Sequence, residues 1–345
     1  MYIKDLTCIS PQKSFNNELF TVGVEKIVGI RYNAIDPDYM DIIPHNLLRR
    51  MGRVVKLGIG TGLTLVKKHN NLNGIIIGTS NGGLEDCFKF LNQIIQYDEG
   101  TLTPTNFVQS TPSAVAGNLA LMSQNTGYNV THINGGLSFE NVLLDTLELL
   151  KENTNASYLI GASEEISDYN FNINLKLDLY KLGETDNTTL LNDNTKGTVN
   201  GEGAAMFVVD NNPENAFAEI LDTDQITFPN NLDIEFKLTE LLKRNNLKYS
   251  DIDAIMVGRN GDVDDDKWYD EFEDKFPESY HLVFKNLCGE YQTASGFSTW
   301  LAAQILKGEK IPALIQRKSS DKSIKHLLIY NHYRGEQHGF ILLCR

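Results

Sequence analysis

A serine stands in the pentapeptide Gly78-Thr79-Ser80-Asn81-Gly82, which matches the G-x-S-x-G pattern of a hydrolase nucleophile. An apolar run precedes this serine and an amphipathic stretch follows it, as the strand-turn-helix context of that pattern requires. A triad would also need an acid and a late histidine, and His332 or His338 occurs in the required chain order. A plain strand-to-helix turn, in which the glycines let the backbone bend, explains the same residues without catalysis.

A second cluster of side chains could bind a metal. Five carboxylates fall at positions 1, 3, 5, 9 and 12 of a calcium-loop pattern: Asp262, Asp264, Asp266, Asp270 and Glu273. Lys267, however, occupies the position at which that loop needs glycine. Carboxylates in the first turns of a helix, where the helix dipole favours them, explain the cluster more simply. We therefore expect no metal site.

The glycines at 58, 60 and 62 weakly resemble a dinucleotide loop. No strand precedes them and no usable acidic residue follows, so we expect a packed helix with a small-residue face and no cofactor. The four cysteines are scattered without a C-x-x-C spacing, and we expect all of them to be reduced packing residues.

Short apolar runs alternate with amphipathic stretches, and this alternation must position any functional residues. Buried strands are predicted at residues 74–78, 157–161, 204–209 and 253–258, and helices at 84–95, 138–150, 238–245 and 295–306. The Asn-, Thr- and Asp-rich residues 184–196 are expected to form a surface loop. Strands that alternate with helices of this length indicate an α/β fold with a mostly parallel, buried sheet.

Two segments of the chain, residues 75–94 and 255–276, resemble each other. Each has a strand that ends in glycine, a turn of Gly and Asn, and a helix, and each is followed by a Gly-rich turn into a second apolar helix. This pattern predicts an internal duplication. The polar, proline-containing residues 211–215 mark the junction, so the expected halves are residues 1–212 and 213–345.

The 345 residues carry a formal net charge of −14, which argues against a nucleic-acid binder and against an anionic membrane surface as partner. No apolar run approaches the ~20 residues that span a bilayer, and we expect a cytoplasmic protein. One basic segment, residues 48–56, contains Arg49, Arg50 and Arg53. It could be a solvated helix face or a docking site for an acidic partner.

At residues 198–206 the sequence Thr-Val-Asn-Gly-Glu-Gly-Ala-Ala-Met looks like a segment of β-ketoacyl synthases, which have the thiolase-like fold. Other stretches agree in order: Arg49-Arg50-Met51 opens a small-residue helix, residues 104–117 resemble the segment before the nucleophile, and residues 285–296 resemble the late Lys-x-x-x-Gly-His…Gly-Ala-x-Gly stretch. Residues 9–12 and 138–140 are most like the synthase-like branch of aryl-polyene and dialkylresorcinol pathways. The resemblance implies two duplicated α/β halves in a layered α-β-α-β-α architecture.

The catalytic positions of that family are not retained. Family enzymes use a Cys nucleophile at the head of a buried helix and two His residues that assist decarboxylation. The Cys position falls at Gly136, within one residue either way, and no Cys occurs in residues 131–139. The first His position falls at Gly258 or its neighbours Arg259 and Asn260, the second falls at Glu290, and only Lys285 is kept from the catalytic set. The family's Gly-Phe-Gly-Gly loop corresponds to residues 333–337. The resemblance therefore implies that this chain has no condensing activity alone.

A family fold without its nucleophile is similar to a chain-length factor, a subunit that pairs with an active ketosynthase and limits the growing chain. The resemblance implies an acyl carrier protein docking on Arg49, Arg50 and Arg53, and a heterodimer with a catalytic ketosynthase. The strand expected to pair across that dimer consists of Asn129, Val130, Thr131, His132, Ile133 and Asn134. The alternatives are a divergent condensing enzyme that uses Ser138, a serine hydrolase that uses Ser80, and a binding module without a biosynthetic role.

Overall fold

The computed structural model describes every residue except 101 and 103, and its strands form a mixed sheet of 11 strands and a separate two-stranded pair. The first half of the chain supplies β1 (Tyr2–Ile9), β3 (Gly74–Gly78), β4 (Tyr128–His132), β5 (Tyr158–Glu164) and β7 (Gly203–Asp210). They lie in the order β4-β3-β5-β7-β1, and β7 is antiparallel to both of its neighbours. If the five strands are numbered by their order along the chain, their order in the sheet is third, second, fourth, fifth, first.

The second half repeats this arrangement. It supplies β8 (Ala218–Thr227), β9 (Ala254–Val257), β10 (Tyr280–Val283), β12 (His326–Tyr333) and β13 (Gln337–Cys344). They lie in the order β10-β9-β12-β13-β8, again third, second, fourth, fifth, first, with β13 antiparallel to both neighbours. The two half-sheets join where Tyr2 and Ile3 of β1 pair with Glu219 and Ala218 of β8. The predicted duplicated α/β fold is confirmed.

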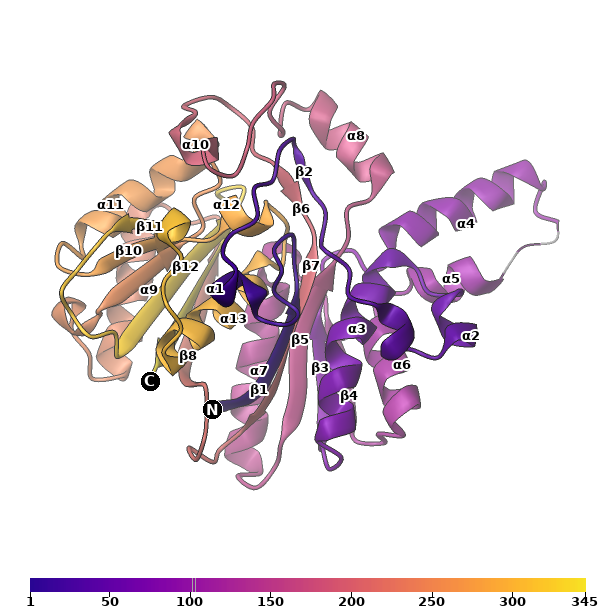
Figure 1. Cartoon of the computed structure of the whole chain (residues 1–345), viewed down its shortest axis with the longest axis horizontal. Helices are drawn as coiled ribbons and strands as arrows, with labels where there is room; N and C mark the ends of the chain where they lie inside the picture. Colours follow the sequence, from indigo (N-terminus) through magenta and orange to yellow (C-terminus); the bar gives the residue numbers. More distant parts are fainter. Residues whose placement is uncertain (101, 103) are drawn as a thin grey trace.

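Helices cover the outer faces of both half-sheets and fill the space between them (Figure 1). α3 (Arg53–Lys68) and α6 (Ala114–Ser123) pack on the first half-sheet, and α9 (Asn231–Arg244) packs on β8 of the second. α7 (Ser138–Glu152) and α13 (Ala294–Lys307) form the central layer and contact strands of both halves. The layers therefore follow the expected order α-β-α-β-α.

The sequence of β7 shows why this sheet is buried on both faces. Ala204, Met206 and Val208 belong to the hydrophobic cluster beneath α3. Ala205, Phe207 and Val209 belong to the cluster around the central helices. Because side chains alternate along a strand, an unbroken apolar run serves two cores at once.

Small residues let α3 approach α6. A Cβ added at Gly58 would lie 2.5 Å from Cγ1 of Val115, and one added at Gly62 would lie 2.8 Å from Cδ1 of Leu119. Both glycines are buried in the middle of α3. The interpretation of residues 58–62 as a small-residue helix face is thus confirmed, and a dinucleotide loop at this position is wrong.

The other helices and strands agree with their predicted ranges except at their ends. α4 (Leu84–Gln96), α7, β5, β9 and α13 lie within a few residues of their predicted ranges. α9 begins seven residues before its predicted start, because Asn230 and Asp233 form a capping box. The stretch 184–196 is not simply a surface loop, since Leu190 is fully buried and Asn187 is nearly so.

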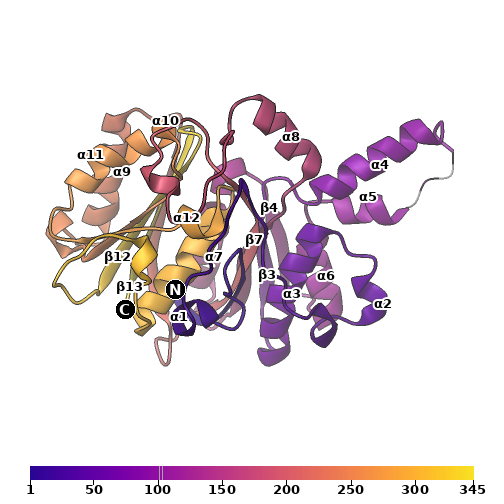
Figure 2. The ribbon, with the colours of Figure 1, turned by 45° about the horizontal axis from the view of Figure 1, so that its top comes forward.

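The remaining helices and strands connect these layers. They are α1 (Glu18–Thr21), β2 (Arg31–Tyr32), α2 (His45–Leu48), α5 (Pro104–Ser110), α8 (Asp168–Lys176), β6 (Asn200–Gly201), α10 (Val263–Asp266), α11 (Asp270–Asp274), α12 (Lys285–Cys288) and β11 (Gln316–Lys318). α4 and α5 stand away from the body of the molecule in both views (Figures 1 and 2). None of the described helices is long and apolar enough to cross a membrane.

Candidate functional site

Gly136, which the sequence comparison predicts at or next to the family's nucleophile position, lies in the single turn Gly135–Leu137 that leads into α7. A Cβ at this residue would overlap Cβ of Tyr333 and would lie 3.1 Å from Cγ of Tyr333 and 3.3 Å from Oε1 of Gln337. The Gly136 N–H donates to Oε1 of Gln337 at 2.7 Å. The space for a side chain at the head of α7 is therefore filled by two residues of the β12–β13 turn.

Tyr333 and Gln337 are held firmly in that space. Nε2 of Gln337 donates to the carbonyl oxygen of Asn134 at 3.2 Å. The Tyr333 hydroxyl accepts a hydrogen bond from Nε2 of Gln292 at 3.2 Å. Sequence comparison identified residues 333–337 as a departure from the family's glycine-rich loop, but it gave no indication of where these side chains would lie.

The other three family positions meet around one buried ion pair. Nζ of Lys285 lies 2.7 Å from Oε2 of Glu290 and donates to the carbonyl oxygen of His332 at 3.0 Å. A Cβ added at Gly258 would lie 3.1 Å from Cε of Lys285 and 2.7 Å from the Tyr269 hydroxyl. Tertiary structure thus brings Gly258, Lys285 and Glu290 together. The Glu290 carboxylate balances the charge of the Lys285 ammonium.

The electrostatics of this cluster oppose enolate chemistry. Burial raises the pKa of Glu290, whereas the Lys285 ammonium and the amide of Asn260, which donates to Oε2 at 2.7 Å, favour the charged form. Burial also lowers the pKa of His332 well below its usual value, so this imidazole is neutral. His332 is tied to the backbone of Asp265 and Gly335. The cluster therefore has a carboxylate where the family needs a group that stabilises negative charge.

Neither candidate serine is hydrogen-bonded to a histidine among the residues that the structure describes. Oγ of Ser138 is fully buried, lies 2.9 Å and 3.1 Å from the carbonyl oxygens of Gly135 and Thr79, and accepts from the Asn134 N–H at 2.8 Å. The backbone N–H of Ser80 donates to Glu164, whose pKa burial raises to about 8. Ser138 therefore has a structural role in this turn.

The late histidines do not complete a triad with Ser80. His332 contacts Asp265 and Gly335, and Nδ1 of His338 lies 2.9 Å from the Tyr330 hydroxyl. Among the described hydrogen bonds none joins either imidazole to Ser80. The described contacts therefore give no support to a triad of Ser80 with either histidine, and the G-x-S-x-G segment lies in the turn between β3 and α4.

The acidic residues at 262–273 are bound to protein groups. The Asp262 side chain accepts from the Asp264 N–H and so caps α10, and Asp264 pairs with Lys196 at 3.1 Å. Asp270 and Glu273 both pair with Arg259. Within the residues that the structure describes, no group of three or more ligating side chains could hold a metal ion. The calcium-loop interpretation is wrong, and helix capping explains the first of these carboxylates.

The basic segment divides into two parts. Arg49 and Arg50, after α2, are exposed. Arg53, at the start of α3, forms ion pairs of 2.6 Å with Asp36 and with Glu202. Arg53 therefore secures the head of α3, whereas Arg49, Arg50 and Lys56 of this segment form no ion pair among the described residues.

The strand expected to pair with a partner lies at the end of the sheet. β4 ends at His132, two residues before the predicted limit, and among the described strands it pairs with β3 alone. Ile133, just beyond the strand, is 55% exposed. Nε2 of His132 lies 2.8 Å from Oδ2 of Asp145 in α7. This edge leaves one row of backbone groups open to another chain.

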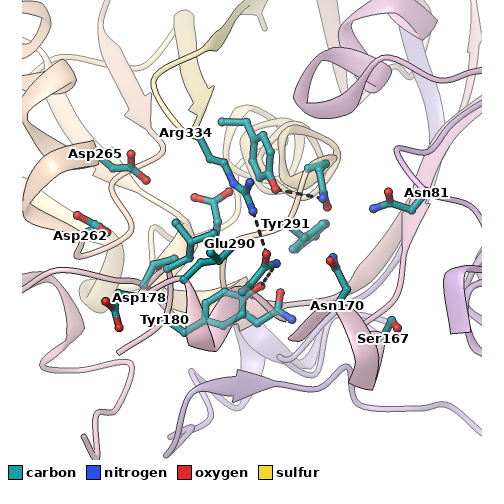
Figure 3. A pocket seen from close by; sticks show the side chains of 18 of the residues that line it. Asn81, Ser167, Asn170, Asp178, Tyr180, Asp262, Asp265, Glu290, Tyr291 and Arg334 are labelled. Carbon is teal, nitrogen blue, oxygen red and sulfur yellow. Dashed lines mark hydrogen bonds between the residues drawn. The ribbon is translucent and has the colours of Figure 1, made fainter. Parts of the chain in front are cut away.

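A pocket of about 620 Å³ opens beside the ion pair, between the two halves (Figure 3). Asn81, Asn170 and Tyr180 line it from the first half, and Asp265, Glu290 and Arg334 from the second. The sequence did not indicate this pocket, because its walls come from six segments that are far apart along the chain.

The comparisons with known proteins agree with this architecture. Residues 30–175 match the family described as "Beta-ketoacyl synthase, N-terminal domain". No curated protein matches the sequence. A β-ketoacyl synthase from Burkholderia phymatum STM815 superimposes with a TM-score of 0.80 at 15% identity, over 100% of this chain and 98% of that one. The predicted resemblance to β-ketoacyl synthases is thereby confirmed, over part of the sequence and throughout the fold.

Two further solved structures are similar. The ishigamide ketosynthase/chain length factor matches with a TM-score of 0.81 at 14% identity, over 99% of this chain and 98% of that one. The second is a complex described as a type II polyketide synthase acyl-carrier protein with its ketosynthase bound to the hexaketide. One of its chains matches with a TM-score of 0.75 at 14% identity, over 99% of this chain and 98% of that one. These matches share the fold.

Proposed function

We propose that this chain, which resembles β-ketoacyl synthases in sequence over residues 30–175 and in fold over its whole length, is a chain-length-factor-like subunit without condensing activity of its own. The observation that carries the proposal is the filled nucleophile position, where Tyr333 and Gln337 occupy the space at Gly136. Condensation in that family needs a thiolate there, and the nearby Ser138 hydroxyl contacts only backbone groups among the described residues.

Its partner, in this proposal, is a catalytic ketosynthase that binds the open edge of β4. Apolar side chains lie exposed around this edge: Ile133 after the strand, and Leu121 on α6, which packs beside β4 and is 80% exposed. The projecting α4 also carries exposed apolar side chains, Leu91 and Ile95. Exposed apolar side chains that gather on one part of a surface are typical of protein interfaces.

Residues 1–212 and 213–345 are proposed as the two duplicated units of this subunit. β7 ends at Asp210 and β8 begins at Ala218, so the proposed junction lies in the connection between the two repeated strand orders. In this proposal the subunit lies in the cytoplasm, and its partner ketosynthase acts on acyl and malonyl groups of a carrier protein, in a pathway of the aryl-polyene type.

Co-expression with a ketosynthase encoded beside this chain, with its Cys and two His intact, should yield a heterodimer by size-exclusion chromatography with light scattering. Leu121→Glu should weaken this heterodimer about tenfold or more, since a charge would be buried in an apolar interface. Leu182→Glu is the matched control, because Leu182 is 81% exposed but lies in the connection after α8. Equal effects of the two substitutions, or a homodimer that ignores the synthase, would refute the pairing.

The acyl carrier protein is proposed to dock on Arg49 and Arg50, since Arg53 is engaged with Asp36 and Glu202. Reversing both free charges, Arg49→Glu with Arg50→Glu, should weaken carrier binding about tenfold at low salt and flatten its salt dependence. Lys151→Glu with Lys243→Glu makes the same total charge change at two exposed lysines elsewhere. Titration of the carrier by fluorescence anisotropy measures both, and identical losses would show a non-specific charge effect and remove this docking site.

A further inference from the structure

α9 carries a second apolar stripe that its packing in the fold does not use. Its inner face is formed by four buried residues, Ile234, Leu238, Leu241 and Leu242. Phe228, Leu232 and Phe236, which we call the outer stripe, follow one another at intervals of four residues and are 74%, 76% and 64% exposed. A surface helix needs one apolar face toward the core and a polar face toward water. The outer stripe is therefore apolar surface that the fold itself does not require.

The first residue of the outer stripe has an unfavourable backbone conformation. Phe228 has a φ of 50°, in the left-handed region, which a bulky side chain rarely adopts. Its N–H donates to the carbonyl oxygen of Glu336, in the β12–β13 turn. Glycine or asparagine would adopt this conformation at lower cost, yet the chain has a largely exposed aromatic ring here. Strained residues of this kind concentrate at functional sites.

The charged groups beside the outer stripe are neutralised within the chain. α9 contains three acidic and three basic residues: Asp233, Glu235, Glu240, Lys237, Lys243 and Arg244. Glu235 lies 3.1 Å from Lys275, and Glu240 lies 3.6 Å from Lys243. The chain as a whole carries a net charge of −14, so two copies repel each other over most of their surface. The outer face of α9 is a place where they can approach.

These features favour a second copy of this chain as the occupant of the outer stripe. A locally neutral helix does not attract an acidic protein, a basic protein or an anionic membrane. The outer stripe spans eight residues, about 12 Å along a helix, and a second copy presents an apolar stripe of the same length. A two-fold axis brings the same patch of both copies together. Figure 2 shows α9 among the elements of the second half, far from α4 and α5.

We propose that two copies of this chain associate through the outer stripe, with the two α9 helices antiparallel. Leu232 then lies at the two-fold axis, and Phe228 of each copy packs against Phe236 of the other, where the aromatic rings stabilise each other. This inference goes beyond the proposed function and does not depend on it, because neither β4 nor a carrier protein takes part. The contact is small, so it dissociates at the dilution of a chromatography column and leaves the expected heterodimer unchanged there.

Sedimentation velocity of the full chain at increasing concentration tests the association. We expect a monomer–dimer equilibrium with a Kd of about 10–100 μM, because the interface is small. Phe236→Glu should weaken it about tenfold or more, since a charge would lie in the apolar contact. Leu182→Glu adds the same charge at a leucine that is 81% exposed elsewhere and should leave the equilibrium unchanged. A monomer at every concentration, or equal effects of the two substitutions, would refute the proposal.

Cross-linking tests the antiparallel arrangement. Under mild oxidation Leu232→Cys should form a covalent dimer with itself, because this residue lies at the two-fold axis. A mixture of Phe228→Cys and Phe236→Cys should cross-link more than either variant alone, and Leu182→Cys should remain at the level of the parent chain. If Phe228→Cys and Phe236→Cys each cross-linked with itself but not with the other, the helices would be parallel and the proposed packing would be wrong.

Phe228→Asn separates association from folding. Asparagine accepts the left-handed conformation, so the urea midpoint of the dilute protein should stay equal or rise, while the Kd of the dimer should increase about tenfold. An unchanged Kd would remove Phe228 from the interface and contradict the proposed packing. Phosphatidylcholine vesicles test the other apolar occupant: a parent chain that binds them, loses this binding with Phe236→Glu and stays monomeric in solution would overturn the proposal.

Discussion

A cysteine introduced at Gly136 will destabilise the protein and leave malonyl decarboxylation at background. Any Cβ at this position overlaps Tyr333 and crowds Gln337, so the β12–β13 turn must move. Overpacking of this kind costs about 1–3 kcal/mol of the free energy of unfolding. In the proposed correspondence Gly258 and Glu290 stand at the family's two histidine positions, so the thiol would lack the two imidazoles that assist decarboxylation in that family. Urea unfolding and release of CO₂ from malonyl carrier protein measure the two effects.

Gly117 provides the matched control for this substitution. It lies in α6, and nothing lies within 4 Å of a Cβ added there. Gly117→Ala should therefore be neutral or stabilising, because alanine favours a helix, whereas Gly136→Ala should be destabilising. Adding Tyr333→Ala to Gly136→Cys should recover part of the loss by opening space. A Gly136→Cys protein as stable as the parent, or one that decarboxylates malonyl groups, would contradict the pseudoenzyme proposal.

Removal of the Lys285 charge should have the largest effect on stability. Lys285 is fully buried, and Lys285→Met would leave the Glu290 carboxylate buried without its cation. Breaking one partner of a buried ion pair typically costs about 3–5 kcal/mol. Lys285→Met combined with Glu290→Gln should restore part of this loss, because both buried charges are then absent and Asn260 still has an acceptor. Chemical denaturation of Lys285→Met, of Glu290→Gln and of the double variant gives the coupling free energy between the two side chains.

An exposed ion pair with the same geometry controls for this experiment. Lys151 and Glu148 also lie 2.7 Å apart, but both side chains are 69% exposed. Lys151→Met should change the free energy of unfolding very little, because solvent screens such pairs. If Lys151→Met and Lys285→Met lowered the free energy of unfolding by similar amounts, burial would not set the strength of the Lys285–Glu290 pair. A double variant no more stable than Lys285→Met would argue against coupling with Glu290.

Local patterns predicted most of the fold. The run of isoleucines at residues 75–77 became β3, and the apolar spacing of residues 138–150 became α7, because buried strands and amphipathic helices have characteristic periods. The sequence pattern did not predict the first seven residues of α9. Leu232 and Phe236 in these turns are apolar but exposed, so they do not follow the apolar spacing of a helix with one buried face. Its capping residues, Asn230 and Asp233, were the signal that could have found it.

The sequence by itself determined the residue types at the three positions that we propose to match the family's nucleophile and two histidines, since the identities of Gly136, Gly258 and Glu290 can be read directly. Only the tertiary structure decided what surrounds them: Tyr333 and Gln337 fill the space beside Gly136, and Lys285 and Glu290 form an ion pair inside the fold. Tyr333 and Gln337 lie about two hundred residues from Gly136 along the chain, yet they meet it across the two halves. Helix and strand periods act over a few neighbouring residues, whereas these contacts depend on how the two half-sheets pack against the central helices.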